Sequence, residues 1–558
     1  MPLALVPSLT LVLFLGPVAG GVVFTLLPAF GYFPALAETA FGLAVFERLF
    51  EQPGLGRSVA LTLWTGFAAT ALSLGLALGF CAAAHGSALF QRTAKLLGPL
   101  LATPHAAVAL GFAFLIAPSG WIARLISPEL TGWVRPPDIA TVGDAAGLAF
   151  VAGLVLKEAP YLLLMAVAAH GQIPAAQSMA VARTLGYSPG VGWLKAVLPQ
   201  LYPQIRLPAY AVLAFSLSAV DVALVLAPSN PPPLAVLVVR WASDPLLELF
   251  LPAMAAASLQ LFLVLAALGA WRLAEAGLAQ ARKRWIERGG RGRAIEPARP
   301  FVRAALLAVL AANAAALAAM ALWSVAAAWR FPDALPQRWT LDNWLREASR
   351  LAVPATTTLS VALAATATAI VLAALCLENE SRRQRAPGAS ALWALYLPLI
   401  VPQVSFLLGA QSVLVKLGWD GTWAALVWLH LLFVLPYVFL VLADPWRSLD
   451  PRYARVASCL GASPWRVFFA VRLPLLLRPI LVASAVGFAV SVGLYLPTLL
   501  GGGGRLTSLT LEAVTLASGG DRRTVGVYAF LQAALPLVAY ALALAIPAFV
   551  FRQRRGMA

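Results

Sequence analysis

The stretch VARTLGYSPGVGWLKAVLP, from Val181 to Pro199, has a counterpart near the other end of the chain, VASCLGASPWRVFFAVRLP, from Val456 to Pro474. Val-Ala, Leu-Gly, Ser-Pro and Leu-Pro recur in both stretches at the same spacings. Each stretch predicts a short helix that ends at a glycine with left-handed backbone, and a second helix that starts at Ser-Pro. One helix–turn–helix therefore occurs twice, which indicates that the whole fold repeats.

The composition places both stretches in an integral membrane protein. Of the 558 residues, 61% are hydrophobic and only 11% are charged, whereas about a quarter of the residues in an ordinary soluble domain are charged. The three cysteines and four histidines are scattered, so they predict neither a disulfide framework nor a metal site. The dipeptide Gly-Lys is absent, which excludes a phosphate-binding P-loop. We therefore expect a membrane protein that needs no cofactor and is not itself an enzyme.

Apolar stretches long enough to cross a bilayer core of about 30 Å recur along the chain. We expect an all-α membrane protein with about 12 transmembrane helices, arranged as two parallel repeats of six. The expected spans of the first repeat are residues 5–30, 58–84, 96–117, 145–170, 205–228 and 246–271. Those of the second repeat are residues 303–328, 354–377, 391–415, 423–443, 479–500 and 524–550.

The distribution of charge predicts the orientation of these spans. With both termini in the cytoplasm, and with charges in the first three residues of a span counted on the adjoining side, the cytoplasmic segments hold 26 Lys and Arg against seven Asp and Glu. The outer segments hold 13 against 14. Cytoplasmic segments of membrane proteins carry an excess of Lys and Arg, so we expect cytoplasmic N- and C-termini. The net charge of +17 is then a topology signal, and no nucleic-acid partner is expected. The lipid bilayer is the partner that composition predicts directly.

The repeat covers nearly the whole chain. PLLATPHAAVALG (99–111) resembles PLIVPQVSFLLG (398–409), and Pro160-Tyr161 resembles Pro436-Tyr437. Because each copy has an even number of spans, both copies enter the membrane in the same direction. We expect a transmembrane domain at 1–271, a basic cytoplasmic linker at 272–302 and a second transmembrane domain at 303–558. The two helix–turn–helix elements are named repeat loop 1 (about 175–200) and repeat loop 2 (about 450–475).

The repeat loops resemble the EAA loop of binding-protein-dependent ABC importer permeases, whose pattern is roughly EAA-x3-G-x9-I-x-LP. The motif's Glu falls on Ala180 and Arg455, so the loops depart from the pattern at that position. The residues that match the motif or shape its two helices are Ala182, Gly186, Ser188, Pro189, Leu198 and Pro199 in the first copy, and Ala457, Gly461, Ser463, Pro464, Leu473 and Pro474 in the second.

This resemblance implies a permease subunit of a type I ABC importer in a bacterial inner membrane. It implies that each repeat loop docks on one copy of an ATPase subunit, and that a periplasmic solute-binding protein delivers the solute. The chain looks most like the fused two-repeat permeases that serve ferric iron and thiamine, and like an uncharacterised branch near them. The expected solute is a small polar or cationic species, thiamine-like or ferric iron-like.

Away from the span ends, three charged residues lie inside expected spans, and each would cost about 2.5–3.5 kcal/mol or more at the membrane centre if it faced lipid. They are Lys157, Glu158 and Asp221, and they should face the interior of the bundle. Lys157 and Glu158 are neighbours on one helix and cannot face each other. They form either a buried pair whose charges neutralise each other and lock helices together, or a gate in the pathway.

Asp221 continues a polar stripe with Tyr210, Ala214 and Ser218 at helical spacing on the fifth span. This stripe lines either the translocation pathway or a hydrogen-bonded contact between helices. Its carboxylate mildly favours a cationic solute. The matching stripe of the second repeat has no charge and consists of Ser484, Phe488, Ser491 and Tyr495. The pathway candidates are Asp221, Ser218, Tyr210, Lys157, Glu158, Ser491 and Tyr495.

Two other classes of protein are open at this point. A secondary active transporter with two parallel six-helix halves would need no ATPase, but it leaves the doubled loop unexplained. A lipid-modifying membrane enzyme would need a cluster of acidic, His or Cys residues at one interface, and the sequence offers none.

Overall fold

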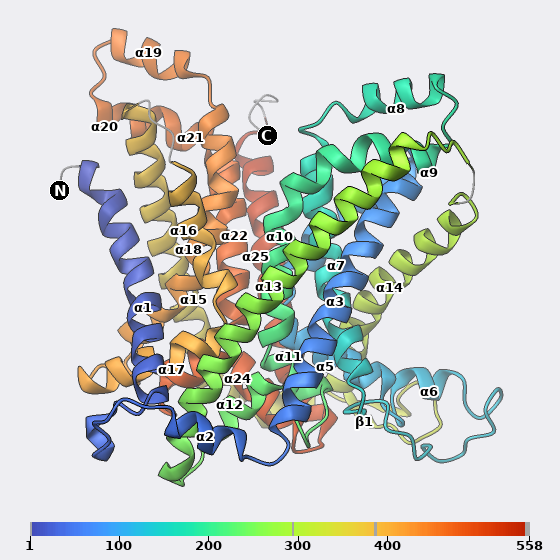
Figure 1. Ribbon diagram of the computed structural model, residues 1–558, viewed down its shortest axis with the longest axis vertical. Coiled ribbons are helices and arrows are strands. Elements are labelled where there is room, and N and C mark those ends of the chain that lie inside the picture. The colour runs from blue at the N-terminus through green and yellow to red at the C-terminus, as the bar shows by residue number, and fades with distance from the viewer. Residues whose placement is uncertain (1–2, 293–294, 384–387, 553–558) are drawn as a thin grey trace.

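The apolar stretches fold into helices because a helix satisfies its own backbone N–H and C=O groups where lipid offers them no partner. The computed structural model describes residues 3–292, 295–383 and 388–552, and it is a bundle of long, tilted helices (Figure 1). Among these described residues, nine helices are long and apolar enough to cross a membrane, or up to 11 if each of two bent pairs counts as one span. The expected all-α, multi-pass fold is therefore confirmed.

Eight helices of the first repeat lie at its six expected spans, because two of these spans are each split into two helices. They are α1 (Val6–Ala29), α3 (Leu55–Ala84), α4 (Ala88–Ala102), α5 (His105–Ile116), α7 (Leu148–His170), α10 (Leu198–Ser218), α11 (Asp221–Leu226) and α13 (Phe250–Glu287). Short helices connect them: η1 (Leu3–Leu5), η2 (Pro34–Leu36), α2 (Ala44–Phe50), α6 (Trp121–Leu125), α8 (Ala175–Thr184), α9 (Pro189–Gly192), η3 (Trp193–Val197), α12 (Leu234–Ala242) and η4 (Leu247–Leu249).

The second repeat has the same order of elements. Its long or split spans are α14 (Ala298–Ser324), α15 (Asp342–Arg383), α16 (Ala389–Ile400), α17 (Gln403–Lys416), α18 (Trp423–Ser448), α22 (Leu477–Gly493), α23 (Leu496–Gly502) and α25 (Arg522–Val550). The remaining elements are β1 (Ala326–Ala328), β2 (Arg338–Trp339), α19 (Pro451–Cys459), α20 (Pro464–Val467), η5 (Phe468–Arg472), α21 (Leu473–Leu475) and α24 (Leu509–Ala517). β1 and β2 pair antiparallel.

A matched hydrogen bond marks equivalent positions in the two repeats. Thr62 Oγ1 accepts from the backbone N–H of Leu234 at 2.8 Å, and Thr358 Oγ1 accepts from that of Leu509 at 2.9 Å. Each threonine lies inside a long helix and holds the start of a short helix, α12 or α24. The internal repeat that the sequence predicts is thus present in the tertiary contacts.

The first helix of each repeat packs against the other repeat. α1 lies along α17, and α14 lies along α5 and α3 (Figure 1). Glycines allow both close approaches: a Cβ atom on Gly409 would lie 1.9 Å from Gly21 O, and one on Gly111 would lie 2.4 Å from Ala316 O. Gly111 and Gly409 end the two similar stretches found in the sequence, so that similarity encodes the contact between repeats.

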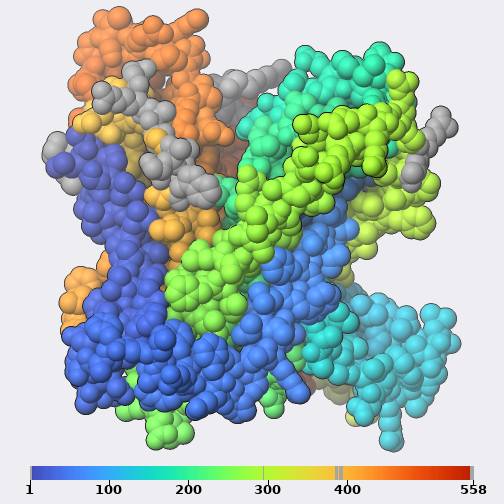
Figure 2. Space-filling view, in the orientation of Figure 1, coloured from blue at the N-terminus to red at the C-terminus, as the bar shows by residue number. Residues whose placement is uncertain are grey.

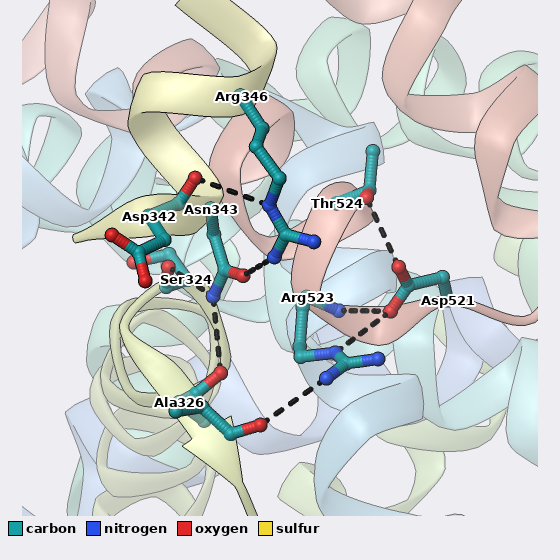
Figure 3. Close-up of polar contacts among 9 residues, drawn as sticks. Ser324, Ala326, Asp342, Asn343, Arg346, Asp521, Arg523 and Thr524 are labelled. Carbon is teal, nitrogen blue, oxygen red and sulfur yellow. Dashed lines mark hydrogen bonds and ion pairs between the residues drawn. The ribbon is translucent and has the colours of Figure 1, made fainter. Parts of the chain in front are cut away.

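One end of the molecule carries the repeat loops and both termini, and the opposite end carries β1, α6 and α12 (Figure 1). At the opposite end, polar contacts tie the α14–α15 connection to the start of α25 (Figure 3). Asn343 Nδ2 donates to Ser324 O at 3.1 Å and to Ala326 O at 3.0 Å, and Arg523 Nη1 donates to Ala327 O at 3.2 Å. These bonds fix the ends of three helices of the second repeat.

Replacing Gly409 with Ala should destabilise the protein by about 1–3 kcal/mol or more, because the new methyl group overlaps backbone atoms of α1. Thermal unfolding of the purified protein in detergent measures the change. Gly20→Ala is the matched control on α1, since a Cβ atom there meets nothing within 4 Å. Equal effects of the two substitutions would contradict the close crossing of α1 and α17.

Candidate functional site

Repeat loop 1 has the helix–glycine–helix geometry that its sequence predicts. α8 ends at Thr184, and Gly186 adopts a left-handed φ of 81°. Pro189 then starts α9, and the π-helical turn η3 carries the chain into α10 at Leu198. A carbonyl–amide bond from Tyr187 N to Ala182 O, 3.0 Å long, closes the turn.

Repeat loop 2 has the same geometry in the second half of the chain. α19 ends at Cys459, Gly461 has a φ of 82°, and the bond from Ala462 N to Ala457 O measures 3.0 Å. The segment Pro464–Leu475 then meets α22 at an angle of 75°, so the chain turns just after Leu473-Pro474. The matched glycines thus shape the same turn in both loops.

In the part of the chain that the structure describes, four spans are broken, two in each repeat. The breaks separate α4 from α5, α10 from α11, α16 from α17 and α22 from α23, and the α16–α17 pair is bent by 99°. Breaks of the two repeats meet, because a Cβ atom on Gly493 would lie 3.4 Å from Pro104 Cβ. Interrupted helices that meet at the interface of two repeats commonly form the solute site of a transporter.

The break between α10 and α11 leaves a carbonyl without its helical partner, and a side chain replaces that partner. Gln260 Nε2 donates to Leu217 O at 3.0 Å. In the second repeat, Thr510 Oγ1 donates to Val492 O, and Gln532 Nε2 donates to Thr510 Oγ1 at 2.7 Å. At each of these two breaks a side chain from elsewhere in the same repeat thus satisfies one freed carbonyl, which stabilises the break.

Lys157 closes the end of α4. Its ammonium group donates to the carbonyl oxygens of Thr103 at 2.6 Å and Leu100 at 3.1 Å. These carbonyls lie in the last turn of α4, where a cation is favoured and helical partners are missing. Lys157 and Glu158 bond to different groups, although their charges still interact, so the pair makes two separate contacts between helices.

Glu158 instead pairs with His105, the first residue of α5. His105 Nε2 and Glu158 Oε1 are 3.1 Å apart, and the histidine side chain is 39% exposed whereas the glutamate is 6% exposed. His105 and Asp221 lie within electrostatic range of each other, and so do Asp221 and Tyr495 of the second repeat. The breaks thus bring Glu158, His105 and Asp221 into one region beside the second repeat.

The polar stripe expected on the fifth span is not one continuous helical face. α10 ends at Ser218 and the backbone of Ala219 is extended, so Asp221 starts a separate helix. Ser218 Oγ donates back to Ala214 O at 2.7 Å. Tyr210 has a different partner: its hydroxyl donates to Glu275 Oε2 at 3.1 Å, and the same carboxylate contacts Tyr202 and Arg206, which follow repeat loop 1 in the sequence.

The matching region of the second repeat is held by a buried histidine. His430 Nδ1 lies 2.8 Å from Ser491 Oγ, and its Nε2 lies 3.1 Å from Thr498 Oγ1. Ser491 and Thr498 lie on opposite sides of the α22–α23 break, so His430 bridges it. The two repeats therefore share their breaks but differ in the charge that lines them.

Neither histidine was predictable as a site residue, because spacing along the chain does not show that each meets a partner on another helix. The available signal for His105 was its position directly after Thr103-Pro104, where a helix must break. Glu275 accepts hydrogen bonds from the hydroxyls of Tyr202 and Tyr210 and forms an ion pair with Arg206. The sequence had placed it only in the expected linker.

Two comparisons with known proteins agree with this architecture. Residues 369–555 match the family model described as "Binding-protein-dependent transport system inner membrane component". The chain is 32% identical over 524 residues, 94% of each chain, to the inner membrane ABC transporter permease protein YnjC of Escherichia coli strain K12. It is also 32% identical over 139 residues, 24% of this chain and 49% of the relative, to the putrescine transport system permease protein PotI of the same strain.

Two parallel repeats, broken spans and a doubled loop define a membrane transport permease. The chain belongs to the family of binding-protein-dependent ABC transporter permeases, since it matches a full-length relative over nearly all of its length. It is a multi-pass membrane protein, and the relative that it matches over 94% of each chain is named an inner-membrane permease. The family membership favours an ABC permease over the secondary active transporter.

Lys157→Met should destabilise the protein by about 1–3 kcal/mol, because it leaves buried carbonyls of α4 without a donor. Thermal unfolding in detergent tests this. Phe433 is the matched position of the second repeat, three residues before Pro436 as Lys157 is three before Pro160, and Phe433→Met should cost less. An unchanged unfolding temperature for Lys157→Met would exclude the role in closing α4.

Proposed function

We propose that the chain is the permease of a type I ABC importer with both transmembrane domains fused, and that the repeat loops couple it to two copies of an ATPase subunit. The observation that carries this proposal is the pair of matched loops at one end of the molecule (Figure 1). Both expose apolar side chains away from the spans, as partner-binding surfaces do. These are Val181 and Leu185 in repeat loop 1, and Tyr453, Val456 and Leu460 in repeat loop 2.

The expected cycle follows from this arrangement. A periplasmic binding protein delivers the solute to the end that carries β1 and α12, and the termini and repeat loops lie in the cytoplasm. ATP binding closes the two ATPases and moves the repeat loops, so that the two halves expose the pathway to each side in turn. The broken spans are the place where the solute passes, because breaks of the two repeats meet at their interface.

The solute that this region suits best is small and cationic, or polar, of the thiamine-like or ferric iron-like kind. Glu158 and Asp221 bring two carboxylates to the breaks, whereas the charge of Lys157 is directed at the carbonyls of α4. Tyr161, Tyr437 and Tyr396 lie within electrostatic range of one another beside Glu158. Aromatic rings and carboxylates together favour cations. The relative that is named for putrescine matches only 24% of this chain, so the choice of solute is based on these residues.

Crosslinking of the chain in its native membrane, followed by mild-detergent purification and mass spectrometry, tests the proposed assembly. We expect two ATPase copies and a periplasmic binding protein, and the small molecule bound to that protein identifies the solute. Recovery of the chain without either partner would contradict the importer assignment.

Gly186→Val and Gly461→Val should each uncouple solute uptake from ATP hydrolysis, because a β-branched residue strains the left-handed turn that shapes each repeat loop. Uptake and hydrolysis are measured together in vesicles. Gly504→Val is the matched control, since Gly504 has a φ of 72°, open space around it and a place at the opposite end. Normal coupling in both loop variants would exclude the coupling role.

Asp221→Asn should lower uptake of the identified solute about tenfold or more if that solute is a cation, because removal of one of two nearby carboxylates weakens a charge contact. Uptake is measured at several solute concentrations with the ATPase rate as reference. Unchanged uptake of a cationic solute would show that Asp221 does not contact the solute and serves the packing of helices instead.

A further inference from the structure

The linker between the two repeats covers repeat loop 1. Lys195 Nζ donates to Gly290 O at 2.8 Å and to Trp285 O at 3.1 Å, and it lies 4.5 Å from the centre of the Trp285 ring. Ser188 Oγ donates to Gly292 O at 3.2 Å. In Figure 2 the yellow-green end of α13 lies against the teal loop, whereas the orange repeat loop 2 projects on the other side.

Glu296 of the linker caps the second helix of repeat loop 1. Its Oε1 accepts from the N–H of Gly190 at 2.8 Å, and its Oε2 pairs with Arg299 Nη1 at 2.7 Å. Arg299 also donates to Ala83 O at the end of α3, 2.8 Å away. One carboxylate therefore ties α9 to the start of α14 and, through Arg299, to α3.

The charge of Glu296 is maintained at neutral pH. Partial burial raises the pKa of this carboxyl, but the bond from Gly190 and the guanidinium of Arg299 outweigh burial and lower the pKa overall. The cap is therefore fully present at pH values above the normal pKa of a glutamate. It is lost only as the pH falls through the lowered pKa of Glu296.

Repeat loop 2 is held without the linker. Ser463 Oγ accepts from the N–H of Arg466 at 3.3 Å and caps the helix itself. Arg382, which pairs with Glu378 at 2.7 Å on the extended end of α15, lies 4.9 Å from the centre of the Trp465 ring. Among the described residues, these contacts of repeat loop 2 come from its own repeat.

Two sequence differences between the repeats follow from the linker. Gly190 corresponds to Trp465, and a Cβ atom on Gly190 would already lie 3.0 Å from Glu296 Oε1 and 3.8 Å from Ile295 Cγ2. A tryptophan side chain has no room there. Glu378 follows Thr358 by 20 positions, and the position 20 after Thr62 is Ala82, which has no charge. The first repeat lacks the residues that hold repeat loop 2, and the linker replaces them.

We propose that Glu296 is a positioning residue for repeat loop 1, and that the linker belongs to the coupling machinery of the first repeat alone. This inference rests on the proposed coupling role of the loops. Because α14 starts the second repeat, a movement of repeat loop 1 reaches the second repeat through Glu296 and Arg299. Repeat loop 2 has no such connection through Glu378. The two ATPases then act on the permease through unequal contacts.

The test compares Glu296→Ala and Glu296→Gln with the control Glu287→Ala, which removes an exposed carboxylate at the end of α13. Amide hydrogen exchange is followed in peptides that cover residues 186–192 and 461–467 of the full-length protein. Glu296→Ala should raise exchange in the first peptide about 10- to 100-fold, the effect of losing one charge-assisted hydrogen bond. Gln keeps an acceptor oxygen, so Glu296→Gln should raise it less, and the second peptide should not change.

Coupled uptake and ATP hydrolysis are then measured with the purified ATPase partner. Glu296→Ala should lower uptake per ATP hydrolysed, Glu296→Gln should restore part of it, and Glu287→Ala should match the unchanged protein. Faster exchange with normal coupling would overturn the positioning role, and unchanged exchange would overturn the cap itself. Failure of the unchanged chain to bind any ATPase would count against the proposed function instead, and the exchange result would still decide the cap.

Discussion

Satisfaction of backbone polar groups inside the membrane is the constraint on which the rest of this structure depends. Unbroken helices meet it without help, but a transport pathway needs helices that open. Each described break in the first repeat has a donor from another helix: Lys157 closes α4, and Gln260 serves the carbonyl freed at the end of α10. The first role of these polar residues inside the spans is therefore to make the helix breaks possible. Only the groups left over after this task, such as Asp221 and the Glu158–His105 pair, are free to meet a solute.

The exchange of first helices between the repeats follows from a second constraint, close packing without a hydrophobic driving force. Lipid chains are as apolar as leucine, so helices associate where small residues let backbones approach. Gly111 and Gly409 provide that approach at equivalent places, and each receives the first helix of the other repeat. The two halves are thereby interlocked through α1 and α14, and a relative movement of the halves must carry these helices with it. Fusion into one chain makes this exchange an intramolecular one.

Much of the fold was predictable because a bilayer allows few alternatives. The span regions, the repeat and the two glycine turns all follow from hydropathy, spacing and backbone stereochemistry. The breaks were harder to predict. Pro104 and Pro402 indicate two of them, but nothing in the sequence around Ala219 indicates the break there. Pairings between helices were not predictable, since nothing in a single sequence shows that Lys157 meets α4 and that Glu158 meets His105. The stripe through Tyr210 failed for the same reason, because helical spacing has meaning only while the helix continues.

Fusion of two domains also removes the requirement that they stay alike. In a pair of identical subunits any residue that serves one loop must serve the other, whereas here the linker exists once and lies beside one loop. Gly190 and Trp465 occupy matched positions but have different neighbours: the linker lies against Gly190, and the guanidinium of Arg382 lies 4.9 Å from the centre of the Trp465 ring. The shared elements of the repeats are therefore those that the membrane and the turns impose. The differences gather where the single linker breaks the symmetry, and at the helix breaks, where only the first repeat places carboxylates.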